Sequence, residues 1–326
     1  MSARVPLVVA LLALGCGGKS GDSAPAGDGA DGSSDGADGT TADQPVSLDG
    51  ACPQEARWGR FTVDSNEDYA AVSGQVADGV VPTAVLTNLV TAGDCTIWRR
   101  ENPFCDPGCD PGFTCSLDLE CVPYPEAQDL GTVDIAGLSA TVSMEPVVPG
   151  FSYFDTSLDN PPWTPGDALT LRTGGGAFDP AVASGIAPDP LDLQTGEWVL
   201  APGAPFTVQW DPAGDDASTE VVLDLRIDLH GLTPSSLQCV FADTGEGVVA
   251  AETLDALIDA GLTGFPEGSL KRRTIDHADI GDGGCFDFVA SSSRRAWVDI
   301  EGYTPCRRDD DCPDGQACNE ALERCE

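Results

Sequence analysis

Cysteine is the residue type with the most evident chemistry in this chain, which holds 13 cysteines but only 2 histidines. Eight of the cysteines fall into two groups of four with similar spacing. The groups are Cys105, Cys109, Cys115 and Cys121, followed by Cys306, Cys312, Cys318 and Cys325. In both groups a glycine stands three residues before the third cysteine, where a tight turn favours glycine. The pattern indicates one small cysteine-rich module that is used twice.

Four cysteines can form disulfides in three ways, and spacing alone does not choose between them. By analogy with other small cysteine-rich modules, we expect the first cysteine to bond to the third and the second to the fourth. The expected bonds are Cys105–Cys115, Cys109–Cys121, Cys306–Cys318 and Cys312–Cys325. Zinc is the alternative, but zinc modules usually bring cysteines in closer pairs. Among the remaining cysteines, proximity in the chain favours Cys52–Cys95 and Cys239–Cys285.

Asp243 begins an Asp-Thr-Gly motif that follows an apolar run. Aspartic proteases carry this motif at the end of a strand, where two carboxylates share a proton and activate water. This chain has no second Asp-Thr-Gly or Asp-Ser-Gly, and Glu246 stands where those enzymes have a small residue. We therefore interpret the motif as a turn that tolerates Asp243→Asn, with a secreted hydrolase using Asp243 as the alternative.

The chain is strongly acidic, with 54 Asp and Glu against 16 Lys and Arg, for a net charge of -38. Nucleic acid is excluded as a partner because its phosphates require a basic surface. Five cationic residues nevertheless lie close together in the last part of the chain. They are Lys271, Arg272, Arg273, Arg294 and Arg295. They predict either a weak site for an anionic ligand, such as a lipid headgroup or an acidic polysaccharide, or local neutralisation of an acidic surface, which we favour.

The N-terminus predicts export and lipid attachment. Residues 1–15 combine one positive charge, an apolar run and a small final residue, as in a signal peptide. The apolar run is shorter than the roughly 20 residues that a membrane-spanning helix needs. The sequence Leu12-Ala13-Leu14-Gly15-Cys16 is similar to a lipobox, which places lipid on Cys16. Lipidation of Cys16 would leave twelve cysteines, an even number that can pair completely.

Residues 16–50 consist mainly of glycine, aspartate, serine, alanine and threonine, with almost no large apolar residue. Such a segment cannot bury enough apolar surface to offset the entropy of ordering, so we expect a disordered acidic tether. Its aspartates could bind calcium, but their spacing matches no EF-hand loop. We expect no resident cofactor, with calcium as the alternative.

From residue 51 onward the apolar residues recur with a period of two, which is typical of strands. The clearest strand is 221–230, and we predict further strands at 58–65, 69–78, 82–90, 131–135, 139–145, 167–172, 206–210, 286–290 and 296–300. Leu254, Leu257 and Ile258 form a helical stripe that ends at Gly261. The sequence therefore predicts an all-β fold, an antiparallel β-sandwich with one short helix and two small disulfide-rich modules.

The predicted domain boundaries follow from these patterns. N-terminal strands of the sandwich occupy 51–100, the first cysteine-rich module 101–125, the main sandwich 126–303 and the second module 304–326. Several stretches together resemble the predicted lipoproteins of myxobacteria and related bacteria. They are Ala13-Leu14-Gly15-Cys16 with the acidic tether, residues 99–105, Cys121-Val122-Pro123-Tyr124-Pro125, and the aspartate-rich segment 309–318.

This resemblance implies a lipid-anchored protein of the cell envelope, and the glycine after Cys16 implies the outer membrane. It implies no activity. We expect a structural, adhesive or ligand-binding module whose partners are the membrane, through its lipid, and an envelope protein or polysaccharide. A calcium-dependent carbohydrate-binding domain is a further alternative, which depends on analogy with other β-sandwiches.

Overall fold

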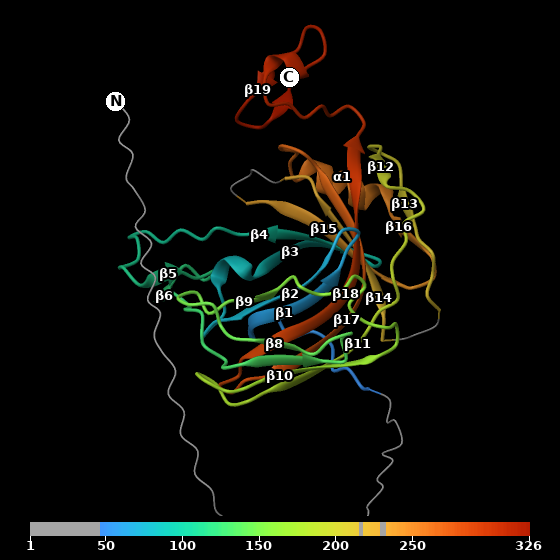
Figure 1. Cartoon of the computed structure of the whole chain (residues 1–326). Helices are drawn as coiled ribbons and strands as arrows, with labels where there is room; N and C mark the ends of the chain where they lie inside the picture. The colour runs from blue at the N-terminus through green and yellow to red at the C-terminus, as the bar shows by residue number, and fades with distance from the viewer. Residues whose placement is uncertain (1–45, 215–217, 229–232) are drawn as a thin grey trace, which may run out of the picture. The chain divides into compact units, whose positions relative to one another are not determined.

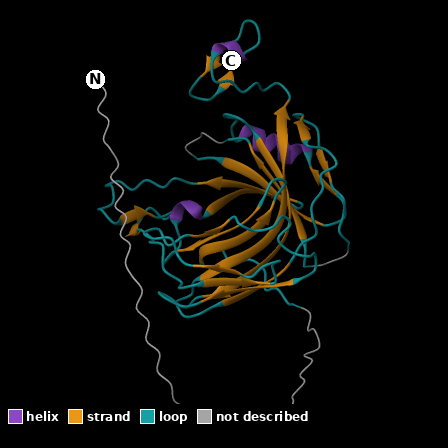
Figure 2. Ribbon diagram, viewed as in Figure 1, coloured by secondary structure: helices purple, strands orange, loops and turns teal. Residues whose placement is uncertain are grey.

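The computed structural model describes residues 46–214, 218–228 and 233–326. The predicted signal peptide, Cys16, His230 and most of the predicted tether lie outside these residues. The described chain is mostly β, with one short α-helix, a large mixed sheet, several small sheets and two disulfide-rich modules (Figures 1 and 2). Within the described residues, no helix is long and apolar enough to cross a membrane.

The large sheet has ten strands. In spatial order they are β3 (Leu86–Ala92), β4 (Cys95–Arg100), β15 (Ser235–Ala242), β14 (Glu220–Arg226), β17 (Glu267–Asp279), β18 (Cys285–Ile300), β1 (Arg57–Ser65), β2 (Ala70–Val76) and β9 (Tyr153–Asp155), with β12 (Glu197–Leu200) also paired to β18. Both β1 and β12 run parallel to β18, so the sheet is mixed rather than purely antiparallel as predicted. Parallel pairing joins segments far apart in the chain, and side-chain alternation does not reveal it.

The smaller elements cover parts of this sheet or form the modules. A four-stranded sheet contains β11 (Val182–Ile186), β10 (Ala168–Thr173), β7 (Val133–Ala136) and β8 (Val142–Met144). Three two-stranded sheets pair β13 (Phe206–Gln209) with β16 (Glu246–Val249), β5 (Phe113–Cys115) with β6 (Cys121–Pro123), and β19 (Cys318–Asn319) with β20 (Arg324–Cys325). The helices are α1 (Ala251–Asp259) and two 3-10 turns, η1 (Pro82–Ala84) and η2 (Asp309–Asp311).

Two hydrophobic cores share the long strand β18. Its first half places Phe286, Phe288 and Ala290 in a core between the large sheet and the four-stranded sheet. Its last part places Ala296 and Ile300 in a second core, which α1, β12, β13 and β16 cover. The sheet-on-sheet packing that the alternation predicted therefore occupies one part of the large sheet, and the helix packs against another.

The predicted helix is present as α1, and it ends shortly before Gly261 as the sequence predicts. Leu254 and Leu257 are fully buried, and Gly261 follows the helix with a φ of +131°, a conformation that glycine adopts readily. The strands predicted at 286–290 and 296–300 are instead one strand, β18. The intervening serines continue the strand, since their backbone stays in register with β17, and the Ser291 hydroxyl donates to Asp64 at 2.6 Å.

Six disulfides join the twelve described cysteines. Both modules have the first-to-third and second-to-fourth pairing that analogy suggested. The prediction for the other four cysteines is wrong, since the bonds are Cys52–Cys285 and Cys95–Cys239, not Cys52–Cys95 and Cys239–Cys285. Parallel pairing of β1 with β18 brings Cys52 to Cys285, and Cys95 lies directly opposite Cys239 across β4 and β15. Six disulfides indicate an extracellular or cell-envelope location.

Candidate functional site

Asp243 lies just after β15 and forms a buried ion pair with Arg272 of β17. Arg272 Nε lies 2.6 Å from Asp243 Oδ2, and the two side chains are 1% and 2% exposed. A second guanidinium nitrogen donates to Asp243 Oδ1 at 3.1 Å, so the pair is bidentate. Trp210 Nε1 also donates to Oδ1, at 2.6 Å. Both carboxylate oxygens of Asp243 are therefore occupied by donors.

The remaining donors of Arg272 bind backbone carbonyls from two other segments. One terminal nitrogen donates to Pro190 O at 2.6 Å and to Asp189 O at 3.4 Å, and the other donates to Asp211 O at 2.6 Å. The guanidinium thus ties four segments of the chain together. This arrangement gives Asp243 a structural role. In the described part of the chain its oxygens bind N–H donors rather than a second carboxylate that could share a proton, so the arrangement does not support the hydrolase alternative.

The five cationic residues do not form one anion-binding surface. Arg272 is buried on one face of β17, whereas Lys271 and Arg273 point to the other face. Lys271 pairs with Asp224 at 3.1 Å and Arg273 with Glu220 at 2.6 Å. Of the other two, Arg294 lies 3.7 Å from Asp192 and Arg295 is exposed. Four of the five are therefore paired with carboxylates, in line with neutralisation of an acidic chain.

His277 and Asp276 hold the N-terminal end of the described chain. His277 Nδ1 lies 2.9 Å from Gly50 O, and Asp276 accepts hydrogen bonds from the backbone N–H groups of Asp49 and Ser184 at 2.9 and 2.8 Å. Asp49 and Gly50, which the sequence assigned to the tether, thus contact the folded part. These hydrogen bonds attach Asp49 and Gly50 to β17.

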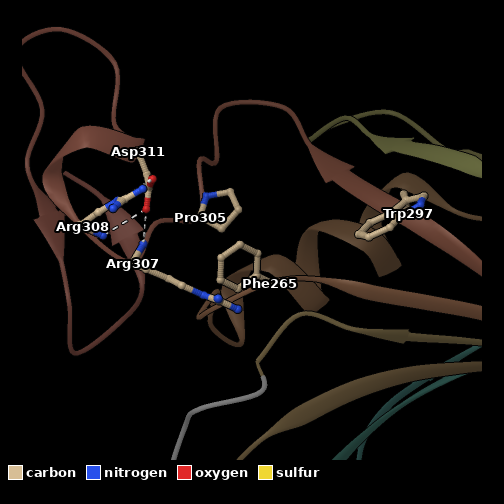
Figure 3. Close-up of a pocket in the computed structure, with 6 residues that line it drawn as sticks. All are labelled: Phe265, Trp297, Pro305, Arg307, Arg308 and Asp311. Carbon is tan, nitrogen blue, oxygen red and sulfur yellow. Dashed lines mark hydrogen bonds and ion pairs between the residues drawn. The ribbon is translucent and has the colours of Figure 1, made fainter.

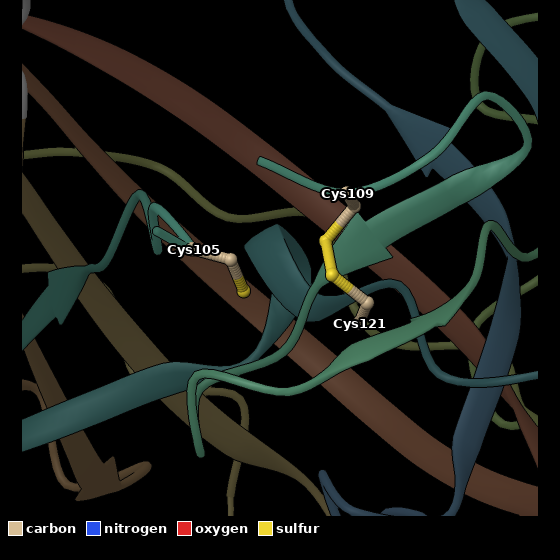
Figure 4. A group of neighbouring side chains, drawn as sticks. All are labelled: Cys105, Cys109 and Cys121. Carbon is tan, nitrogen blue, oxygen red and sulfur yellow. A yellow bond between two sulfur atoms is a disulfide. The ribbon is translucent and has the colours of Figure 1, made fainter. Parts of the chain in front are cut away.

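Two groups of cysteine side chains lie close enough together to share a metal ion. They are Cys105, Cys109 and Cys121 (Figure 4), and Cys306, Cys312 and Cys325. Every one of these sulfur atoms belongs to a disulfide. A disulfide sulfur is not a thiolate and does not serve as a zinc ligand, so these cysteines act as structural cross-links.

A cleft lies where the second module meets the main fold (Figure 3). It has a volume of about 690 Å³, and its lining residues are Phe265, Trp297, Pro305, Arg307, Arg308 and Asp311. Trp297, near the end of β18, is 83% exposed, although tryptophan is usually well buried. Phe265, which precedes β17, is 38% exposed. The cleft therefore combines two accessible aromatic rings with two arginines.

Local interactions fix the arginines at this cleft. The Arg307 guanidinium lies 5.0 Å from the centroid of the Phe265 ring, a cation–π contact (Figure 3). Asp311 Oδ2 accepts the backbone N–H groups of Arg307 and Arg308 at 2.9 and 3.2 Å. Donation from the Arg307 N–H group lowers the pKa of the Asp311 carboxyl below its usual value. Asp311 thereby holds the loop that presents both arginines.

Tyr303 and Gly264 join the second module to the main fold. The Tyr303 hydroxyl donates to Gly264 O at 2.6 Å, and Gly264 N donates to Leu322 O at 3.0 Å. Burial raises the pKa of Tyr303 to about 12, so its hydroxyl stays protonated at neutral pH. These bonds place Phe265, the residue after Gly264, beside the arginines of the module.

The sequence pattern does not predict this cleft, although it contains one signal for it. The alternation of Ala296, Val298 and Ile300 predicts that they share one face of a strand, which puts Trp297 on the opposite, polar face. A tryptophan at a solvent-facing position is unusual enough to indicate a binding residue. The contribution of Arg307 and Phe265 depends on contacts between distant segments, which the sequence pattern does not contain.

No family model matches the chain, and no curated protein matches it. A solved structure, the FN1–FN3 domains of chicken CNTN1, aligns with a TM-score of 0.18 and 10% sequence identity. The alignment covers 65% of this chain and 65% of that chain, just under two thirds of its length.

Proposed function

We propose that the folded part is a ligand-binding module attached to the cell envelope by lipid on Cys16, and that its ligand binds in the cleft of Phe265, Trp297 and Arg307. The observation that carries this proposal is the 83% exposure of Trp297 within that cleft. A rigid indole ring contributes a large contact area and loses little conformational entropy on binding. Leaving such a ring in water gains nothing for folding, so a binding role explains its position.

The position of the cleft along β18 also supports this proposal. The chain enters the fold at residues 49–52, and Cys52 is bonded to Cys285 at the start of β18. Trp297 lies near the other end of the same strand, which has 16 residues. At about 3.3 Å per residue, such a strand spans roughly 50 Å. An anchor at one end and a cleft near the other would present the ligand site away from the membrane.

The proposal is tested by binding of the purified full chain to polysaccharide and protein fractions of the cell envelope. The informative variant is Trp297→Ala, and its matched control is Phe104→Ala, since Phe104 is an aromatic residue of the first module with 81% exposure. We expect wild type and Phe104→Ala to bind one fraction equally and Trp297→Ala to bind at least about tenfold more weakly, as for an interface anchor. Equal binding by all three proteins, or binding by none, would contradict the proposal.

A further inference from the structure

We infer that the ligand of this cleft is an acidic polysaccharide. One sugar ring of the polymer packs on Trp297, and a carboxylate of the same polymer binds Arg307. The inference rests on the proposed function. Arginines are scarce in a chain with 16 cationic and 54 anionic residues, yet two consecutive ones line the cleft. Both are exposed. Their position on an acidic protein is best explained by a ligand that carries negative charge.

Arg307 is prepared to bind a carboxylate. Among the described residues, its guanidinium contacts the Phe265 ring and pairs with no carboxylate. This cation–π contact provides no acceptor that would engage the guanidinium N–H groups in conventional hydrogen bonds. Those groups have the fork geometry that binds a carboxylate through two hydrogen bonds. The contact with Phe265 also restricts the side chain before the ligand arrives, which lowers the entropic cost of binding.

Asp311, the acidic residue of the cleft, does not block this site. Its Oδ2 atom accepts the backbone N–H groups of Arg307 and Arg308, and its Oδ1 atom lies 3.6 Å from Arg308 Nε. Asp311 is thus committed to Arg308 and to the loop backbone. The pairing leaves Arg307 as the cation with unoccupied donors.

The surroundings of Trp297 set the orientation of the ligand. Trp297 lies directly opposite Glu267 on β17 and Glu197 on β12. These carboxylates disfavour a negative group at the Trp297 end of the cleft. The same end suits the apolar C–H face of a sugar ring, which packs on an indole without needing charge. A carboxylated sugar chain satisfies both ends, with its ring at Trp297 and its acid at Arg307.

The test compares acidic polysaccharides with the same polymers after methyl esterification, which removes the charge and keeps the sugar rings. The probes are polygalacturonate, alginate and hyaluronate, each offered to the purified full chain. The variants are Arg307→Gln and Trp297→Ala, with Arg100→Gln and Phe104→Ala as controls, because Arg100 and Phe104 are exposed and lie outside the lining of the cleft.

We expect at least one acid to bind and its ester to bind at least about tenfold more weakly, since charge-assisted hydrogen bonds are the stronger ones. Arg307→Gln should remove this difference, Trp297→Ala should weaken both forms, and the controls should behave as wild type. Equal binding of acid and ester, both dependent on Trp297, would overturn the acidic ligand and leave the binding module standing. Binding of none of the three acids would also overturn this inference, whereas envelope binding that ignores Trp297→Ala would refute the proposed function itself.

Discussion

The carboxylate of Asp243 forms an ion pair with the guanidinium of Arg272, and both side chains are almost completely buried. The two residues belong to segments that flank β14, so the pair connects non-adjacent parts of the large sheet. Arg272 also binds the carbonyls of Pro190 and Asp211. Because a buried charge is tolerated only while its partner remains, each residue of the pair depends on the other.

Asp243→Asn should lower the free energy of unfolding by about 3–5 kcal/mol, the usual cost of leaving one member of a buried ion pair uncompensated. This expectation replaces the turn interpretation, in which asparagine was tolerated. Chemical denaturation of the full chain measures the effect. Asp134→Asn is the control, since Asp134 is exposed on β7 and its replacement should change stability by less than about 0.5 kcal/mol. Similar stability of the two variants would show that the pair is dispensable.

The disulfide pattern can be mapped directly. Proteolysis without reduction, followed by mass spectrometry, should yield peptides joined through Cys52–Cys285 and Cys95–Cys239. Replacing both Cys95 and Cys239 by alanine should cost about 2–5 kcal/mol of stability, as for other native bridges. Recovery of peptides joined through Cys52–Cys95 would contradict the pairing of β1 with β18.

Stability at high pH should depend on Tyr303. Its pKa is raised to about 12 in the folded chain, whereas tyrosine in an unfolded chain titrates near about 10. The stability that this shift provides is complete below about pH 10 and is lost as the pH rises through about 12. Wild type should therefore lose more stability across this window than Tyr303→Phe. Tyr69→Phe serves as the control because Tyr69 is 52% exposed, and parallel pH profiles for wild type and Tyr303→Phe would disprove the effect.

Lipid attachment at Cys16 remains a prediction from the sequence. Cys16→Ser should release the protein from membranes and abolish labelling with a fatty-acid analogue, because the thioether to lipid needs the cysteine sulfur. Ser20→Ala, four residues later, should leave both properties unchanged. A wild-type protein that takes up no label and fractionates as soluble would refute the lipid anchor.

The sequence predicted elements whose side chains follow a simple apolar period, such as β1, β13 and α1. It missed β17, because the inward-facing positions of this strand include Arg272, Thr274 and Asp276, which are buried and polar. These side chains bind the backbone of the segment that crosses the strand, for example the Thr274 hydroxyl, which donates to Ile186 O at 2.7 Å. Polarity patterns report exposure only when buried positions are apolar, and here they are not.

Analogy with other cysteine-rich modules predicted the pairing in the two modules, in which all bonds close short loops. Proximity in the chain failed for Cys52 and Cys95, because their partners are 233 and 144 residues away. The candidate cleft also depends on contacts between distant segments. Phe265 and Arg307 meet only because the second module packs against the main fold. Residue types along the chain left a structural, adhesive or ligand-binding role open, and the residues of the candidate cleft come together only in the tertiary structure.

The parallel arrangement of β1 and β18 has a mechanical consequence. If the envelope holds the N-terminal end and a ligand holds the cleft, tension enters at Cys52 and leaves through the end of β18. The Cys52–Cys285 bond carries this load covalently into β18. Were the bond reduced, the load would pass through β1, whose eight register pairs with β18 would be sheared together rather than peeled apart one by one. Under such tension the disulfide is the first element to bear the load, and the pairing of β1 with β18 is the second.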